Sequence, residues 1–375
     1  MTTPNRQIVL ELGACWIRAG LGGRHHPTYV EATPGALLSG GRVQCLEQLS
    51  IIFTHGLQVR PKECVVVVVE KATTAREHRT NVLHVLLKDL QVQAVTMQMD
   101  LCMTILASGS SSLTGLVVDI GSRETRLMAV ALGRPILQTL RIVGIGMAQA
   151  LDVFSALLLE HLEILPAETG EGKGRGEGIA SLFQKVANAA PDCPDVTVSP
   201  KDWLNGQSFA LPAALRRVPL LALINGQARK SLHSDQVEVL YPEGVAGALA
   251  ACALACNHDI RKQCLANVVV CGGGGLVPDL PRLLCDEAWR LLSLTHLAAP
   301  SSPRPTPASH AFSADSLAWT GAALFASAKS AARGGARERF ITLKDFEARQ
   351  STAPDWQSLD AQDWIFSAPV PPPSS

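Results

Sequence analysis

The stretch IVLELGACWIRAGLGG, Ile8–Gly23, opens with an apolar run that carries one carboxylate, Glu11. Gly13 follows two residues later, and a single cation, Arg18, lies in the apolar run that comes next. Because glycine tolerates the backbone conformations of a tight reversal, the pattern predicts two strands joined by a turn. The acid then lies at the end of the first strand, beside the turn.

The same pattern returns at LVVDIGSRETRLMAV, Leu116–Val130. An apolar strand again ends in an acid, Asp119, and Gly121 again follows two residues later. Either hairpin alone is most simply an ordinary tight turn that contains an acid. Two copies along one chain favour an internal duplication instead.

Two such hairpins have the groups that a phosphate site needs. Backbone N–H groups at a glycine turn can bind phosphate oxygens, because no Cβ blocks their approach. A carboxylate at a strand end can hold Mg²⁺ through the water shell of the ion, and a nearby cation neutralises phosphate charge. The predicted clamp consists of Glu11, Gly13, Arg18, Asp119 and Gly121, with Glu11 and Asp119 as the candidate metal ligands.

A third segment is VVVCGGGGLVPDLPRLL, Val268–Leu284, in which a β-branched run leads into four glycines. Bare backbone of this kind can pack closely on a flat ring such as adenine. We therefore assign Gly272, Gly273 and Gly274 to nucleotide binding. A flexible turn is the simpler alternative.

The glycine-rich segment GEGKGRGEG, residues 170–178, has a different interpretation. A phosphate-binding P-loop requires Ser or Thr after its Gly-Lys pair, whereas Lys173 is followed by Gly174. The composition predicts a solvated loop inserted between elements. A second surface loop, rich in proline, is predicted at residues 299–309.

The order of the other patterns indicates an α/β protein. CVVVVVE, Cys64–Glu70, is typical of a strand covered on both faces, and Thr74–Lys88 follows it with helical spacing of its apolar residues. Strands and helices in alternation predict the α/β class. A chain of 375 residues has room for two domains or for one duplicated domain.

The composition argues against several classes of protein. Apolar residues make up 47% of the chain and charged residues 18%, as in a well-buried globular protein. Lys+Arg and Asp+Glu balance at 33 each without a basic block, which argues against nucleic-acid binding. The longest apolar runs, such as Gly244–Cys256, are shorter than the ~20 residues of a membrane span.

The first residues lack the apolar core of a signal peptide, so we expect a cytoplasmic protein. Its ten cysteines would then be reduced. Cys252 and Cys256 have no second Cys or His pair at metal-ligand spacing. We expect most of the thiols to be buried in the core.

Together these segments resemble the actin superfamily over most of the chain. The likeness is strongest in HDIRKQCLANVVVCGGGG (His258–Gly275), in Val59–Val95 and in LAWTGAALFAS (Leu317–Ser327). The two hairpins take the places of the two phosphate loops of actin, with Arg18 at the position of the phosphate lysine.

The resemblance implies the actin-like ATPase fold, in which two ribonuclease-H-like α/β domains enclose a nucleotide cleft, here with a reduced small lobe. The first domain would comprise residues 1–108 and 311–375, with a C-terminal tail at 340–375, and the second would comprise residues 109–310. The resemblance also implies ATP or ADP with Mg²⁺ as the ligand.

This chain departs from actin at positions that, in actin, bind the nucleotide or take part in its hydrolysis. Actin has Asp in place of Glu11, and an acid and a glycine where this chain has Ser122 and Arg123. The glutamine that orients the hydrolytic water falls at Asp100, which is shorter and would repel a γ-phosphate. Gln98 is close in sequence but lies off that face. We therefore expect no catalytic residue and at most a residual ATPase activity; alternatively, Arg123 fills the cleft and nothing binds.

The C-terminal segment differs from that of conventional actin. Its sequence Pro354-Asp355-Trp356-x-Ser358-Leu359 is similar to the tail of an actin-related subunit at the pointed end of dynactin. Residues 32–57 are also too few for the lobe with which actin grips the next subunit. We expect Pro354, Asp355 and Trp356 to contact a partner or this chain itself, because aromatic anchors dominate interfaces.

This likeness implies a non-catalytic structural subunit of the cytoskeleton, which caps the actin-like filament of dynactin and supports dynein-dependent transport along microtubules. Its partners would be the actin-related subunits of the filament and the other pointed-end subunits. The alternative, from the same fold, is an ATPase or a sugar-kinase-like phosphotransferase.

Overall fold

The computed structural model describes residues 6–34, 41–163, 173–199, 208–226, 229–230, 237–238, 244–295, 303–331 and 340–354. Contacts within the chain divide it into two compact units. Unit 1 takes Met1–Thr114, Val130–Ile136 and Ser309–Ser375, and unit 2 takes Gly115–Ala129 and Leu137–Ala308. The mixed α/β architecture of both units matches the predicted fold class.

A mixed five-stranded sheet forms the centre of unit 1. The pairs β3–β2 and β2–β1 are antiparallel, whereas β1–β4 and β4–β5 are parallel. The strands, in their spatial order, are β3 (Tyr29–Ala32), β2 (Trp16–Leu21), β1 (Arg6–Leu12), β4 (Cys64–Glu70) and β5 (Ala94–Met99). The predicted first hairpin and the predicted strand Cys64–Glu70 are both confirmed.

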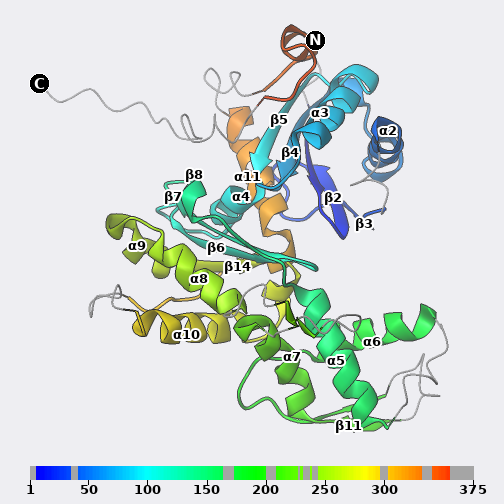
Figure 1. Cartoon of the computed structure of the whole chain (residues 1–375). Helices are drawn as coiled ribbons and strands as arrows, with labels where there is room; N and C mark the ends of the chain where they lie inside the picture. The colour runs from blue at the N-terminus through cyan, green and yellow to red at the C-terminus, as the bar shows by residue number, and fades with distance from the viewer. Residues whose placement is uncertain are drawn as a thin grey trace, which may run out of the picture. The chain divides into compact units, whose positions relative to one another are not determined.

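Helices cover both faces of this sheet, as Figure 1 shows. One face packs in a single apolar core with α2 (Arg42–Ile51), α3 (Arg76–His84) and the π-helical turn η3 (Val85–Asp89). The other face contacts α11 (Leu317–Ala331), which in turn packs on α4 (Asp100–Ala107). Burial on both faces explains why β4 needs an unbroken run of valines.

The contact between α11 and α4 is unusually close. Trp319 is fully buried and donates its Nε1–H to the Val9 carbonyl oxygen at 3.2 Å. Two residues on, a Cβ added at Gly321 would lie under 3.0 Å from the Met103 carbonyl oxygen, inside any real contact. Glycine at this position lets the two helix backbones touch, and it fixes α11 against the sheet.

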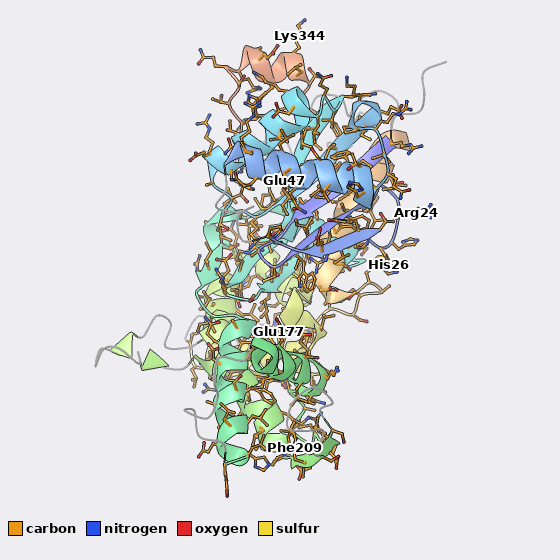
Figure 2. The ribbon with its side chains drawn as sticks, turned by 90° about the vertical axis from the view of Figure 1, so that its right-hand side faces the viewer. Arg24, His26, Glu47, Glu177, Phe209 and Lys344 are labelled. Carbon is orange, nitrogen blue, oxygen red and sulfur yellow. The ribbon has the colours of Figure 1, made fainter. Side chains whose placement is uncertain are left out.

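The C-terminal segment closes the far edge of the sheet in unit 1. Ile341 pairs with Val95 through two backbone hydrogen bonds of 2.8 and 2.9 Å. The helix α12 (Leu343–Ala348) follows, with Thr342 and Asp345 forming a capping box. Phe346 is fully buried in the core, whereas Lys344 points away from the helix in Figure 2.

The sheet of unit 2 repeats the strand order of unit 1. Its order is β14–β6–β7, and β9 pairs antiparallel with β7 on the outer side. The strands are β6 (Gly115–Ile120), β7 (Thr125–Ala131), β9 (Arg141–Val143) and β14 (Val268–Cys271). The last two residues of β7 and the short β8 (Arg134–Pro135) that pairs with them are counted in unit 1. As β4 does on β1, β14 lies parallel to β6. This is the order that an internal duplication predicts.

The proline-rich segment at residues 299–309 differs in part from the predicted surface loop. Of residues 299–309, those from 303 onward are described, and they lie along the free edge of β14 rather than projecting as a loop. The Val268 N–H donates to the Thr306 carbonyl oxygen at 2.9 Å, and the Ala308 N–H donates back to the Val268 carbonyl oxygen at 2.8 Å. The reason is that a buried strand edge needs hydrogen-bond partners, and an edge position tolerates proline.

Helices make up most of the rest of unit 2. They are α5 (Met147–His161), α6 (Lys173–Val186), α7 (Ala213–Asn225), α8 (Gly244–Leu254), α9 (His258–Leu265) and α10 (Leu280–Ser293). Two short hairpins accompany them, β10 (Val196–Val198) with β11 (Phe209–Leu211) and β12 (Arg229–Lys230) with β13 (Val237–Glu238).

The prediction of a loop at residues 170–178 is wrong from Lys173 onward, where α6 begins; the earlier residues lie outside the described part. Downstream apolar residues at helical spacing explain the difference. Leu182 and Phe183 are buried, and the Phe183 ring lies 4.9 Å from that of Phe154 on α5. This burial outweighs the cost of about 1 kcal/mol that each glycine imposes on a helix.

The cysteines follow the prediction of buried thiols. Nine of the ten are buried and reduced, and Cys15 is exposed. Among the described residues, no helix has the length and apolar character to cross a bilayer. The same part of the chain contains no group of three or more His, Cys, Asp or Glu residues arranged to hold a metal ion.

Gly321→Ala is expected to destabilise the protein by roughly 1–3 kcal/mol, because the new Cβ must push α11 away from α4. Urea denaturation measures this loss. Gly144→Ala is the matched control, since its Cβ would meet nothing within 4 Å. Equal stability of the two variants would contradict the close contact.

Candidate functional site

The predicted site residues fall in both units, and each half is described by itself. In unit 1 the turn between β1 and β2 is closed by the Gly13 N–H, which donates to the Trp16 carbonyl oxygen at 3.0 Å. A Cβ at Gly13 would lie 2.6 Å from that same oxygen. The Gly13 N–H is therefore occupied, contrary to its predicted role as a phosphate donor. Within the described residues, the next two N–H groups, of Ala14 and Cys15, donate no hydrogen bond.

The turn between β6 and β7 in unit 2 has the same geometry. The Gly121 N–H donates to the Glu124 carbonyl oxygen at 3.0 Å, so this glycine is also occupied. Here the N–H groups of Ser122 and Arg123 donate no hydrogen bond within the described residues. Both turns therefore repeat one hydrogen-bond pattern, and the donors they offer follow the glycine.

The turn in unit 2 is held rigidly by α5. The first N–H groups of that helix, from Met147 and Ala148, donate to the Gly121 and Ser122 carbonyl oxygens at 2.9 and 2.8 Å. A Cβ at Gly146 would lie 2.5 Å from the Ser122 carbonyl oxygen. The helix N-terminus is thus satisfied by the turn, which fixes the direction of the donors that follow Gly121.

Arg18 joins two carboxylates in unit 1. It lies opposite Glu11 in the β1–β2 register, with its Nη1 atom 3.3 Å from Glu11 Oε1. Its Nη2 atom lies 3.2 Å from Oδ2 of Asp315, which comes from the segment just before α11. The side chains of Arg18 and Glu11 are 10% and 17% exposed. The predicted phosphate cation is therefore already neutralised by protein acids.

Asp119 in unit 2 is neutralised in the same way. Arg126 on β7 forms an ion pair with Asp119 at the end of β6, and its Nε atom lies 3.6 Å from Glu124 Oε1. The Arg126 side chain is only 4% exposed, so its charge must be paired within the protein.

The sequence interpretation missed Arg126, although the repeat contains it. In both hairpins the arginine comes seven residues after the acid with which it pairs, Arg18 after Glu11 and Arg126 after Asp119. Extending the comparison of the two hairpins past the glycine would have found it. The duplicated unit is thus a complete acid–turn–arginine hairpin.

The glycine quartet lies directly over the end of β6. Gly272 has a positive φ of 76°, and a Cβ there would collide with the Asp119 carboxylate and the Ile120 carbonyl oxygen. A Cβ at Gly274 would lie 2.5 Å from Ile120 Cγ2, whereas one at Gly273 would meet nothing within 4 Å. The structure therefore brings Gly272–Gly274 together with Asp119 and Gly121. It also explains why glycine is needed at Gly272 and Gly274, where a Cβ would clash with the end of β6.

Asp100 is a helix-initiating residue. It is buried at the first position of α4, and its Oδ1 accepts the Leu101 N–H at 2.8 Å. Strand β5 runs as far as Met99, so the residues just before Asp100 are extended and the helix begins only at Asp100. Gln98 is buried on β5 and donates to Thr96 Oγ1 at 3.1 Å. Its Oε1 atom has no hydrogen-bond partner among the described residues.

These contacts fit a phosphate group better than a metal ion. The N–H groups after each turn glycine can donate to phosphate oxygens. The two predicted metal ligands, Glu11 and Asp119, are each engaged by an arginine, and a dication beside that arginine would be repelled. The residues present therefore fit the phosphates of a nucleotide through their backbone, and fit Mg²⁺ poorly.

The first residue of the segment predicted to contact a partner or this chain is buried. Pro354 is buried within unit 1, and the Ala353 N–H donates to Thr80 Oγ1 of α3 at 3.2 Å. Because α12 turns the chain back over α3, Pro354 packs on this chain, which is the second of the two contacts expected for it. Asp355 and Trp356 lie outside the described residues.

Arg126→Leu is expected to cost roughly 2–3 kcal/mol of unfolding free energy, because it leaves the Asp119 carboxylate without its partner. The loss should be smaller than for a fully buried pair, since Asp119 keeps an 18% exposed side chain. Adding Asp119→Asn should restore part of the lost unfolding free energy. A double-mutant cycle, in which urea denaturation gives the stability of each variant, measures this.

The matched control is Arg282→Leu, which breaks an ion pair of Arg282 and Asp279 whose side chains are 53% and 38% exposed. Such exposed pairs contribute about 0–1 kcal/mol. A loss at Arg126 no larger than this would mean that the ion pair is unimportant to the hairpin.

A comparison with protein families agrees with this architecture. The family model described as Actin matches residues 42–180 and 219–335, more than half of the chain. The matched ranges include α2, the strands β4 to β7 and the glycine quartet. The chain therefore belongs to the actin family.

Proposed function

We propose that this chain is a non-catalytic structural subunit that caps the pointed end of the actin-like filament of dynactin, the position held by actin-related protein 10 (also called 11). In this role it supports dynein-dependent transport along microtubules. It acts in the cytoplasm as part of the cytoskeleton, and its partners are the filament subunits and the other pointed-end subunits.

The observation that carries this proposal is the short connection between β3 and α2. Strand β3 ends at Ala32 and α2 begins at Arg42, which leaves only residues 33–41 between them. Actin has at this place the extended lobe that grips the next subunit. A subunit without the lobe can end a filament, because a further subunit has nothing to hold.

The residues after this connection support the same conclusion. Cys45 and Leu49 of α2, with Ile52 and Phe53 just beyond it, are buried in the core of unit 1. Glu47 lies on the outer face of the helix in Figure 2. Residues 42–53 are therefore part of the packed core and cannot serve as a projecting lobe.

We propose that the chain is not catalytic because of the charged residues at the candidate site. Asp100 stands where actin has the glutamine that orients water, and here it begins a helix. Glu11 and Asp119, the acids expected to hold the metal ion, are each paired with an arginine of their own unit. A phosphate or metal ion would have to compete with these pairs.

We propose that ATP or ADP binds as a structural ligand. Within unit 2, the N–H groups of Ser122 and Arg123 would hold its phosphates, and Gly273 has the open space for a ring. When bound, the nucleotide supplies negative charge to these donors. Any Mg²⁺ would come with the phosphates, since Glu11 and Asp119 already hold Arg18 and Arg126.

One observation favours the alternative, an actin-fold ATPase or a sugar-kinase-like phosphotransferase. The buried Gln98 amide has an acceptor oxygen without a partner, two residues before Asp100. A residue that orients a water molecule or a hydroxyl group needs such an acceptor.

With Mg-ATP, the purified chain is expected to release little phosphate over many minutes. Slow release follows from the paired acids and from Asp100 at the water-orienting position. Rapid release that is abolished by Gln98→Leu or Asp100→Ala, with unchanged unfolding curves, would instead establish the enzyme. Denaturing the purified chain and identifying any released nucleotide tests the structural ligand.

Affinity purification of the full chain from cells is expected to recover dynactin subunits. Trp356→Ala should weaken this recovery, and loss of a central aromatic anchor typically costs at least about 2 kcal/mol, or roughly thirtyfold in affinity. Gln357→Ala is the neighbouring control. Recovery of no dynactin subunit by the intact chain would overturn the proposed function, and recovery unaffected by Trp356→Ala would remove only the tail from the interface.

A further inference from the structure

The outer edge of the sheet in unit 1 is formed by β3. This strand comes at one end of the strand order, and among the described residues it pairs only with β2 (Figure 1). Val30, Glu31 and Ala32 are all exposed. An edge strand presents a row of backbone N–H and C=O groups with which a further strand can pair.

The ladder between β2 and β3 shows which backbone groups point outward. The Thr33 N–H donates to the Cys15 carbonyl oxygen at 2.9 Å, which makes these residues a hydrogen-bonded pair. Because such pairs alternate along an antiparallel ladder, Glu31 also turns its backbone groups toward β2. Val30 and Ala32 turn theirs outward, and no hydrogen bond reaches them there within the described residues.

Glu31 puts a negative charge in the middle of this edge. Its Oε2 atom accepts hydrogen bonds from the Tyr29 hydroxyl group and from Gln48 Nε2 on α2, the second at 3.4 Å. Both donors are neutral, and Glu31 forms no ion pair in the part of the chain that the structure describes. The carboxylate is therefore held in place while its charge stays uncompensated.

A second copy of this chain is a poor occupant of the edge. If Val30 and Ala32 of each copy both paired, the Glu31 side chains of the two copies would lie directly opposite each other. Like charges in opposed positions destabilise a pair of strands. A charged residue on an edge strand is a common means of preventing such self-pairing.

A strand with a basic residue opposite Glu31 gains an ion pair where a second copy meets repulsion. In an added antiparallel strand this position is a non-hydrogen-bonded pair, whose Cβ atoms are about 4.5–5.5 Å apart. The two neighbours of the basic residue lie on the other face, beside Val30 and Trp16, whose side chains are 52% and 48% exposed. Apolar residues suit these positions, so the edge fits a segment that reads apolar–basic–apolar.

We propose that β3 is a docking edge for an extended segment of a partner protein, which adds to the sheet of unit 1 as an antiparallel strand with Lys or Arg opposite Glu31. Backbone hydrogen bonds to Val30 and Ala32 supply affinity, and the ion pair supplies specificity. The inference uses contacts within unit 1 alone and does not rest on the proposed role in dynactin.

Two labelled peptides test the charge preference of the docking edge. Fluorescein-Thr-Val-Lys-Val-Thr-amide has the proposed pattern, and the matched peptide replaces the central Lys by Glu. In anisotropy titrations of the full chain, we expect the Lys peptide to bind roughly threefold to tenfold more tightly than the Glu peptide. The difference should shrink at high salt, because an exposed ion pair is screened.

Amide hydrogen exchange, followed by NMR, locates the bound strand. In the free chain the outward N–H groups of Val30 and Ala32 are expected to exchange rapidly. With unlabelled Lys peptide at ten times its Kd, exchange at both should slow about tenfold. The Glu31 N–H faces β2 and should change less. Slow exchange of Val30 and Ala32 in the free chain would mean that the edge is already covered, and would overturn the proposal.

Two variants assign the contacts. Glu31→Lys should reverse the preference, so that the Glu peptide binds more tightly than the Lys peptide. Glu47→Lys is the matched control, because Glu47 is exposed on the outer face of α2, and it should leave the preference unchanged (Figure 2). Val30→Pro removes one outward donor at an edge position, where proline is tolerated, and should weaken both peptides roughly threefold to tenfold.

The charge reversal decides the proposal even if Val30→Pro fails to fold. No binding of the Lys peptide, equal affinity for the two peptides, or an unreversed preference in Glu31→Lys would each overturn it. A dimer in sedimentation equilibrium that slows exchange at Val30 and Ala32 would also overturn it, because the occupant would then be a second copy of this chain.

Discussion

An arginine that pairs with the acid of its own hairpin is the interaction on which the candidate site residues of each unit depend. Glu11 and Asp119 lie at strand ends with side chains only 17% and 18% exposed. A carboxylate so far removed from water needs a counter-charge, and in each unit the next strand supplies it. Since the pairing is internal to each hairpin, a metal ion or a phosphate group at either acid would have to compete with an arginine.

Close backbone contacts explain most of the glycines that resemble a nucleotide site. Gly272 and Gly274 lie where a Cβ would strike Asp119 or Ile120, and Gly146 and Gly321 lie where one would strike a carbonyl oxygen. These glycines are required for packing whether or not a ligand binds. Gly273 differs, because the space beside it is open. A glycine-rich motif is therefore weak support for a ligand until the contact of each residue is known.

The chain thus has the framework of the actin family, and three of its local features bear on its proposed role. The connection between β3 and α2 is short, the acids are paired with arginines, and the C-terminal segment packs back over α3. The first bears on the proposed place at a filament end, the second on the proposed absence of catalysis, and the third on the proposed role of the tail. None of these features disturbs the two sheets, because all three lie at strand ends and connections.

The sequence by itself determined the strands of the two hairpins and their duplication, together with β4 and β14. The valine run of β4 and the repeated acid–glycine hairpin are local patterns, and burial on both faces or a tight turn permits few alternatives. Tertiary structure alone decided the contacts between distant residues. Arg18 meets Asp315 across 297 positions, Pro354 is buried by the path of α12, and α6 is helical because Leu182 and Phe183 reach a core. Local patterns could not predict these, because the free energy of a charge pair or an apolar contact depends on which distant segment the fold places beside it.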